Sequence, residues 1–115
     1  MPQRSVHVAV PGATYDVEVG GGASLRAASW LGSLAQTPDR VAVVADERVV
    51  ELHGALDLSS AGVPGGESET LTLPGGEAIK TFRVLEDVLD FCSGAKLSRG
   101  SVLIAYGGGT IGDLA

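Results

Sequence analysis

The chain has few of the residues that define several common protein classes. Its 115 residues include one cysteine, Cys92, which excludes an internal disulfide and a cysteine metal cluster. One Trp, two Tyr and two Phe leave the core to be built mainly from Val, Leu, Ile and Ala. No apolar run approaches membrane-spanning length, and the N-terminus lacks the charged and apolar regions of a signal peptide. We therefore expect a folded, cytoplasmic domain with no membrane partner.

Basic residues are also scarce. Eight Lys and Arg stand against fourteen Asp and Glu, which gives a net charge of −6. This balance disfavours broad contact with a phosphate backbone, so we expect no nucleic-acid partner, and any anion site must be local. Glycine, in contrast, is abundant at 17 residues, so a glycine pattern taken alone is weak evidence.

The most informative stretch is the last fifteen residues. An apolar, strand-like run over 101–106 leads directly into three glycines, and Thr110 is expected to cap a helix after them. Gly107, Gly109 and Gly112 then read G-x-G-x-x-G between a strand and a helix, where the first amides of the helix suit a pyrophosphate. A plain glycine-containing turn would look similar, and that alternative stays open.

The pattern of apolar residues predicts strands alternating with helices. We expect a β-hairpin over 5–10 and 14–19, helices over 24–36, 47–56 and 77–93, and strands over 41–45, 69–73 and 101–106. Segment 58–69 reads as a loop, with a short strand near 61–63 left open. This order predicts one α/β, Rossmann-like domain with a mostly parallel sheet after an N-terminal β-hairpin.

The same pattern predicts which side chains face the core. On the hairpin, one face carries Val6, Val8, Val10, Tyr15, Val17 and Val19, while His7 lies on the opposite, polar face. In helix 24–36, capped by Ser24, the inward residues are Leu25, Ala28, Leu31 and Leu34. In helix 77–93 they are Ile79, Phe82, Leu85, Val88, Leu89 and Cys92.

Three polar residues follow predicted strands and are candidates for ligand contact. Asp46 ends the continuously apolar run 41–45, where open α/β sheets bind ligands, and it can also cap the next helix. Glu77 and Lys80 follow a glycine turn at the end of strand 69–73. Their spacing puts them on one helical face, either as a surface pair or with Lys80 offered to a phosphate or hydroxyl.

Three segments together carry a family resemblance: V-A-V-V-A-D (41–46), L-P-G-G-E-A-I-K (73–80) and R-G-S-V-L-I-A-Y-G-G-G-T-I-G-D-L-A (99–115). In this order and spacing they resemble the N-terminal domain of 3-dehydroquinate synthase and the wider sugar phosphate cyclase family. Two positions depart from the pattern: Thr110 stands where an apolar residue is more frequent, and Gly75 where Asp is common.

The resemblance implies an enzyme of the shikimate pathway that depends on NAD and on a divalent metal, zinc or cobalt. It converts 3-deoxy-D-arabino-heptulosonate 7-phosphate to 3-dehydroquinate and phosphate. Carried over by motif, the NAD-binding positions are Asp46, Gly76, Glu77, Lys80, Gly108, Gly109, Thr110, Ile111, Gly112 and Asp113. Asp113 would lie beside the nicotinamide-side ribose or phosphates, and the amides around Gly108 and Gly109 would hold the pyrophosphate.

Enzymes of this family are longer than this chain. Their metal ligands and substrate-binding Lys and Arg lie in segments beyond it, and His7 and His53 fall in the wrong elements to replace them. We therefore expect residues 1–115 to be an N-terminal dinucleotide-binding domain, inactive without a helical, metal-binding C-terminal domain, with no catalytic or metal-ligating residue of its own. The partners implied are that domain, a sugar phosphate and, as one possible assembly, a second subunit in a homodimer.

Three alternatives stay open. The first is a related cyclase that uses sedoheptulose 7-phosphate, because such cyclases vary at the glycine loop. Metal-dependent glycerol and alcohol dehydrogenases share the strand, glycine triplet, helix and Asp arrangement but differ around G-E-x-x-K. A non-catalytic nucleotide-binding module is the third, and it should be well folded alone without a large exposed apolar face.

Overall fold

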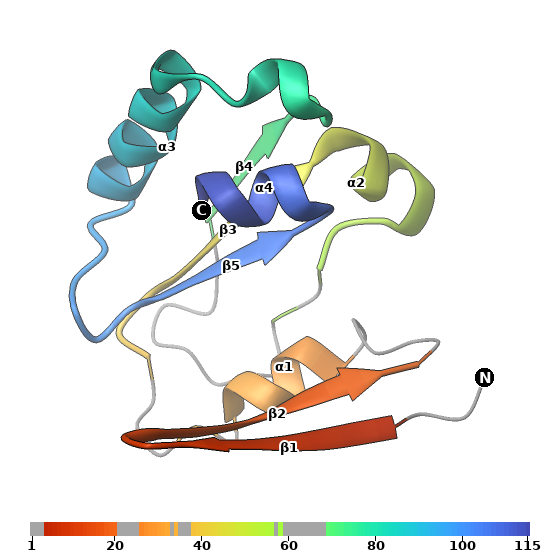
Figure 1. Ribbon diagram of the computed structural model, residues 1–115. Helices are drawn as coiled ribbons and strands as arrows, with labels where there is room; N and C mark the ends of the chain where they lie inside the picture. The colour runs from red at the N-terminus through yellow and green to blue at the C-terminus, as the bar shows by residue number, and fades with distance from the viewer. Residues whose placement is uncertain (1–3, 21–25, 33, 35–37, 57, 59–68) are drawn as a thin grey trace.

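A parallel sheet of three strands lies at the centre of the chain and follows a separate two-stranded hairpin (Figure 1). The computed structural model describes residues 4–20, 26–32, 34, 38–56, 58 and 69–115. The sheet has the order β4-β3-β5, with β3 at Val41–Asp46, β4 at Glu69–Leu73 and β5 at Val102–Tyr106. Helices separate these strands in the sequence, so the predicted Rossmann-like α/β fold with an N-terminal hairpin is confirmed.

The central strand β3 is buried on both faces. Its first five residues are at most 4% exposed, as expected for a continuously apolar strand of a parallel sheet. Val43 and Ala45 point to a cluster that includes Leu31, while Val44 points to the opposite cluster with Val88 and Ile111. The alternating side chains of this one strand therefore join both layers of the core.

The hairpin consists of β1, Arg4–Val10, and β2, Ala13–Val19. Its register places Val6 opposite Val17, so the predicted apolar face is confirmed, although that face is largely exposed in this structure. On the other face His7 Nδ1 lies 2.7 Å from Asp16 Oδ1, which confirms the polar position of His7. An ion pair between Arg26 and Glu18, at 3.1 Å, links the hairpin to the segment that leads into the first helix.

Two short helices lie next to β3. Helix α1 spans Ala27–Gly32 and buries Ala28 and Leu31, as predicted. The predicted cap at Ser24, the inward Leu25, the end near Gln36 and the short strand at 61–63 fall outside the described residues. Helix α2, Glu47–His53, ends before residue 56 because Gly54 takes a φ of 79° that stops helical hydrogen bonding.

The predicted helix over 77–93 is wrong in its first turn. A short 3-10 helix, Glu77–Ile79, is followed by a break, and helix α3 then spans Phe82–Gly94. Thr81 is extended, with φ −130° and ψ 160°, and its side chain accepts a hydrogen bond from the Val84 amide. Thr81 therefore caps α3, and its extended backbone separates α3 from the 3-10 helix before it.

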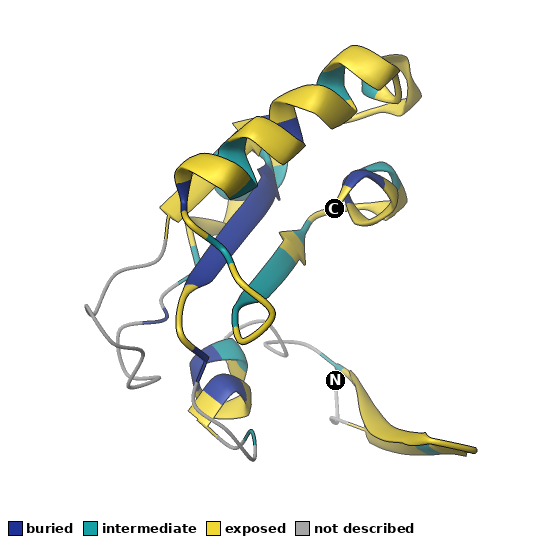
Figure 2. Ribbon diagram, turned by 90° about the vertical axis from the view of Figure 1, so that its left-hand side faces the viewer, coloured by how far each residue is buried: buried dark blue, intermediate teal, exposed yellow. Residues whose placement is uncertain are grey.

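The predicted inward face of α3 is also partly wrong. Phe82, Leu85 and Leu89 are 92%, 36% and 61% exposed. The side chains that pack toward the core are Ile79 before the helix and Val84, Val88, Phe91 and Cys92 on it. Figure 2 shows that most of α3 is exposed and that only short parts of the helix are buried. In the described ranges, no helix is long and apolar enough to cross a bilayer.

Candidate nucleotide-binding site

The carboxyl ends of the three sheet strands meet at one edge of the sheet. Asp46 at the end of β3 lies in register with Leu73 of β4, and its neighbour Ala45 with Tyr106 of β5. Because the strands are parallel, the loops after β4 and β5 both begin beside Asp46. Open α/β sheets bind their ligands in the crevice outside these strand ends.

Two glycines allow these loops to approach Asp46 closely. A Cβ at Gly75 would collide with the Asp46 carboxylate, and a Cβ at Gly107 would lie 2.7 Å from the Asp46 Cβ and 3.2 Å from Ile111 Cγ1. Asp46 Oδ1 also accepts a 2.8 Å hydrogen bond from the Arg48 amide and so caps α2. The capping role left open by the sequence is thus present, with Gly75 against the same carboxylate and Gly107 against the Cβ of Asp46.

The glycines after Gly107 face open space instead. A Cβ at Gly108, Gly109 or Gly112 would meet no atom within 4 Å. Gly108 is the N-cap of helix α4, Gly109–Leu114, so the prediction that Thr110 caps this helix is wrong. The amides of the first helical turn have no acceptor within their own helix.

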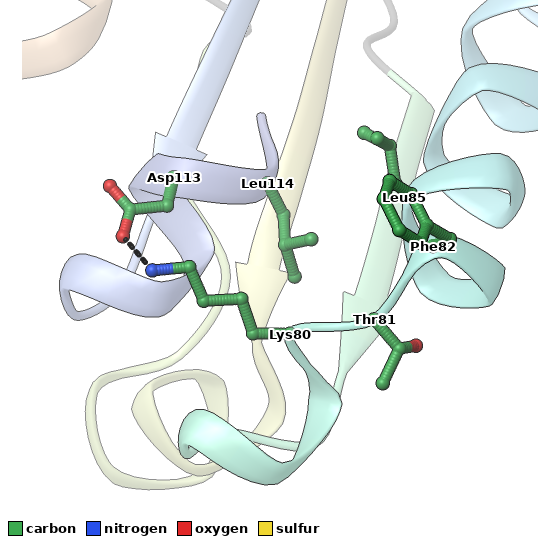
Figure 3. Close-up of a pocket in the computed structure, with 6 residues that line it drawn as sticks. All are labelled: Lys80, Thr81, Phe82, Leu85, Asp113 and Leu114. Atoms are coloured by element: carbon green, nitrogen blue, oxygen red, sulfur yellow. Dashed lines mark hydrogen bonds and ion pairs between the residues drawn. The ribbon is translucent and has the colours of Figure 1, made fainter.

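Thr110 makes a different contact, which joins the two loops. Its hydroxyl Oγ1 donates to Glu77 Oε1 at 3.1 Å. On the same helix Asp113 Oδ2 accepts from Lys80 Nζ at 3.0 Å, as Figure 3 shows. The segment after β4 and the helix after β5, 33 residues apart, are therefore linked by one hydroxyl–carboxylate hydrogen bond and one ion pair.

The charges around Lys80 favour its protonated form. The hydrogen bond to Asp113 and the charges of Asp113 and Glu77 raise the pKa of Lys80, while slight desolvation lowers it. Lys80 is therefore an ammonium group at neutral pH, held in place beside two carboxylates. An ammonium group has three N–H donors, so Lys80 can keep its bond to Asp113 and also donate to a phosphate or hydroxyl oxygen of a ligand.

A shallow pocket of about 260 Å³ adjoins the charged pair. It is lined by Lys80, Thr81, Phe82, Leu85, Asp113 and Leu114. Apart from Lys80 and Asp113 its walls are mainly apolar, and α3 provides one side while α4 provides the other (Figure 3). The Lys80–Asp113 pair, which links the two loops, thus borders an apolar surface.

The structure brings most of the predicted binding positions to one edge of the sheet. Gly76 is the N-cap of the 3-10 helix with φ 99°, so its backbone conformation disfavours any side chain. Ile111 is 1% exposed and belongs to the core, which leaves its backbone amide as the group that can reach a ligand. The NAD-binding positions carried over from the resemblance do not include Gly75, Gly107 or Thr81, although Gly107 is the first glycine of the G-x-G-x-x-G pattern and Gly75 belongs to the glycine turn after β4.

The metal implied by the resemblance does not fit the described residues. No three His, Cys, Asp or Glu side chains in these ranges come together as ligands. His7 contacts Asp16 on the hairpin, and His53 is the exposed last residue of α2. We derive no reaction step through a metal from this chain.

Fold and site together define a Rossmann-like α/β domain with a glycine-lined, charged strand edge. A family model described as 3-dehydroquinate synthase N-terminal matches residues 70–115. The 3-dehydroquinate synthase of Roseobacter denitrificans is 43% identical over 112 residues, which cover 96% of this chain and 30% of that protein. The 3-dehydroquinate synthase of Rhodospirillum rubrum is 41% identical over 101 residues, which cover 88% of this chain and 26% of that protein. That of Enterococcus faecalis is 36% identical over 108 residues, which cover 94% of this chain and 30% of that protein.

The chain therefore belongs to the 3-dehydroquinate synthase family. It spans only about 30% of the length of the curated relatives that it matches. The segment matched by the family model contains both glycine loops and the four residues that link them, Glu77, Lys80, Thr110 and Asp113. Asp46 lies before this segment.

Proposed function

We propose that residues 1–115 are the N-terminal dinucleotide-binding domain of a 3-dehydroquinate synthase, and that the dinucleotide is NAD. The observation that carries this proposal is the pair of links between the two glycine loops, Lys80 to Asp113 and Thr110 to Glu77, beside open space at Gly108 and Gly109. These links hold charged and polar groups next to Gly108 and Gly109, where a Cβ would meet no atom of the described residues within 4 Å.

The diphosphate of NAD fits the open side of α4. Glycines at 108, 109 and 112 let a ligand approach the backbone, because no Cβ projects there. The amides of the first turn and the positive end of the helix favour a negative group. Lys80 can supply a further positive charge to the same ligand.

The carboxylates suit the ribose hydroxyls. Asp46, Glu77 and Asp113 lie on three different strand-end segments and accept hydrogen bonds, as ribose hydroxyls require. A 2′-phosphate would meet negative charge at these positions, so this set favours NAD over NADP. Asp46 is held by its bond to the Arg48 amide, and Asp113 by Lys80, so neither carboxylate needs to be ordered by the ligand.

The complete reaction belongs to a longer protein. Asp46, Glu77, Lys80 and the glycines of α4 would hold NAD, and the cofactor would supply hydride-transfer chemistry for a ring carbon of the sugar phosphate. This chain would bind and orient the cofactor, while groups for the metal and for 3-deoxy-D-arabino-heptulosonate 7-phosphate come from the remainder that the relatives possess. A cytoplasmic location and the formation of 3-dehydroquinate and phosphate are parts of the same proposal.

Calorimetric titration of the chain with NAD tests the binding role. We expect heat of binding at millimolar NAD, and Asp113→Asn should weaken binding about five- to tenfold, or about 1 kcal/mol, by removing a charged acceptor. Asp87→Asn, on the exposed side of α3, is the matched control and should leave the affinity unchanged.

Two results would contradict the proposal. One is the absence of any heat from the unmodified chain and from its longer form at millimolar NAD. The other is equal NAD affinity in the chain and in Asp113→Asn. An assay of the longer form with the heptulosonate phosphate and, separately, with polyols distinguishes the synthase from a polyol dehydrogenase.

A further inference from the structure

Three apolar side chains of α3 form a stripe that the rest of the described chain leaves uncovered. Phe82, Leu85 and Leu89 are spaced three and four residues apart, so they lie on one face of the helix. Their exposures of 92%, 36% and 61% are unusual for a Phe and two Leu that adjoin one another. We call these three residues the α3 stripe.

The α3 stripe borders the end of α4. Phe82 and Leu85 line one side of the pocket of about 260 Å³, and Leu114 lines the other. Figure 3 shows Leu114 projecting from α4 between the charged pair and the side chains of α3. The C-terminal end of α4 lies on the side of that helix that faces α3 (Figure 1), and Leu114 near this end borders Phe82 and Leu85.

In the relatives, polypeptide continues past this point. The chain covers 30% of the Roseobacter denitrificans protein, and the matched family model is described as N-terminal. A longer α4, or a helix soon after it, would start at the edge of the α3 stripe.

We propose that the α3 stripe is the docking surface for an amphipathic helical segment that continues the chain beyond α4 in the longer protein. The segment would place an apolar face on Phe82, Leu85 and Leu89. Glu86 follows Phe82 by one turn and precedes Leu89 by three residues, so it flanks the stripe with negative charge. The segment should therefore carry Lys or Arg beside its apolar face.

A second copy of the chain suits this surface less well. Three side chains of this size bury a few hundred Å², whereas a stable complex needs about 1,200 Å² or more. A segment attached at Ala115 does not lose translational freedom when it docks, so a small apolar contact suffices to hold it.

Thiol labelling tests the proposal in the 115-residue chain and in the form extended by its own reading frame. In a Cys92→Ala background, a maleimide reports the exposure of Leu89→Cys, with Asp87→Cys on the polar side of α3 as the control. We expect Leu89→Cys to react at least about tenfold more slowly in the extended form, and Asp87→Cys to react equally in both. Labelling needs no nucleotide, so its outcome is separate from that of the NAD titration.

Three outcomes would overturn the proposal. Equal reaction of Leu89→Cys in both forms would show that the following segment does not cover the stripe. Protection in the 115-residue chain that increases with protein concentration would identify a second copy as the occupant. A reading frame that stops at Ala115 would remove the proposed segment altogether.

Discussion

Individual side chains connect segments of the site that lie far apart in the sequence. Asp46 joins the end of β3 to the start of α2, and Gly75 and Gly107 let two loops close around it. Lys80 and Asp113 join the other two segments across 33 residues. Each of these contacts depends on the parallel strands ending at one edge.

The Lys80–Asp113 pair makes stability depend on pH in the alkaline range. Because the pKa of Lys80 is raised in the folded state, the pair stabilises the chain fully below pH 10.5 and loses this contribution as pH rises through the higher folded-state pKa. Urea unfolding between about pH 9 and about pH 12, compared with Lys80→Arg, measures this effect.

Lys80→Arg is a suitable control because its guanidinium stays charged over this range. The difference in unfolding free energy between the two proteins should be constant below pH 10.5 and should shift against the unmodified chain above it. Parallel curves over the whole range would show that the pair does not persist in solution. The contributions of the other titrating groups cancel in this difference because both proteins contain the same groups.

The start of helix α3 determines how Glu77 and Lys80 are placed in the candidate site. The sequence pattern supports one helix from Glu77, but Thr81 starts a new one at Phe82. The break turns Lys80 toward Asp113 and frees Glu77 to accept from Thr110. Three apolar residues that the sequence predicted to face inward, Phe82, Leu85 and Leu89, are exposed.

The cap at Thr81 can be tested directly. Its hydroxyl accepts the Val84 amide at 3.2 Å, so Thr81→Ala should lower the free energy of unfolding by about 1 kcal/mol. Thr81→Ser keeps the acceptor and should lose only a few tenths of that amount. Urea denaturation followed by far-ultraviolet circular dichroism measures both.

Equal stability of Thr81→Ala and the unmodified chain would mean that the break in the helix is held by something other than this cap. In that case the geometry of Lys80 would have to come from its own contact with Asp113. Combining Thr81→Ala with Lys80→Arg separates the two contributions.

The core of the molecule has two layers, and both of them pack on strand β3. Leu31 of α1 is 1% exposed and packs on the β3 face that bears Val43 and Ala45, while α3 and α4 cover the other face. Since the hairpin lies outside the sheet, α1 links the N-terminal part of the chain to the core.

Leu31→Ala should therefore destabilise the whole domain. Truncating a fully buried Leu costs about 2 to 5 kcal/mol, whereas Leu52→Ala, at a position 64% exposed on α2, should cost less than about 0.5 kcal/mol. The urea midpoints of both variants provide the measurement. A loss confined to the N-terminal part, with the sheet intact, would show that the two parts unfold separately.

Much of the fold follows from local patterns. The continuous apolar run at 41–45 predicts a strand buried on both faces, and the alternating hairpin predicts the pairing of Val6 with Val17. Both predictions are confirmed because strict apolar alternation is typical of a half-buried strand, and a short run without polar residues is typical of a strand buried on both faces. The boundaries at Thr81 and Gly108 were missed, since capping competes locally with helical periodicity and the outcome depends on tertiary contacts.

The sequence by itself determined the order of strands and helices, the glycines at the strand ends and the family to which the chain belongs. Only the tertiary structure decided that Asp113 meets Lys80, that Thr110 bonds to Glu77 and that Phe82 stays exposed. The physical reason is that apolar periodicity and backbone preferences act over a few residues. Contacts between loops 33 residues apart exist only once parallel strands bring their ends to one edge.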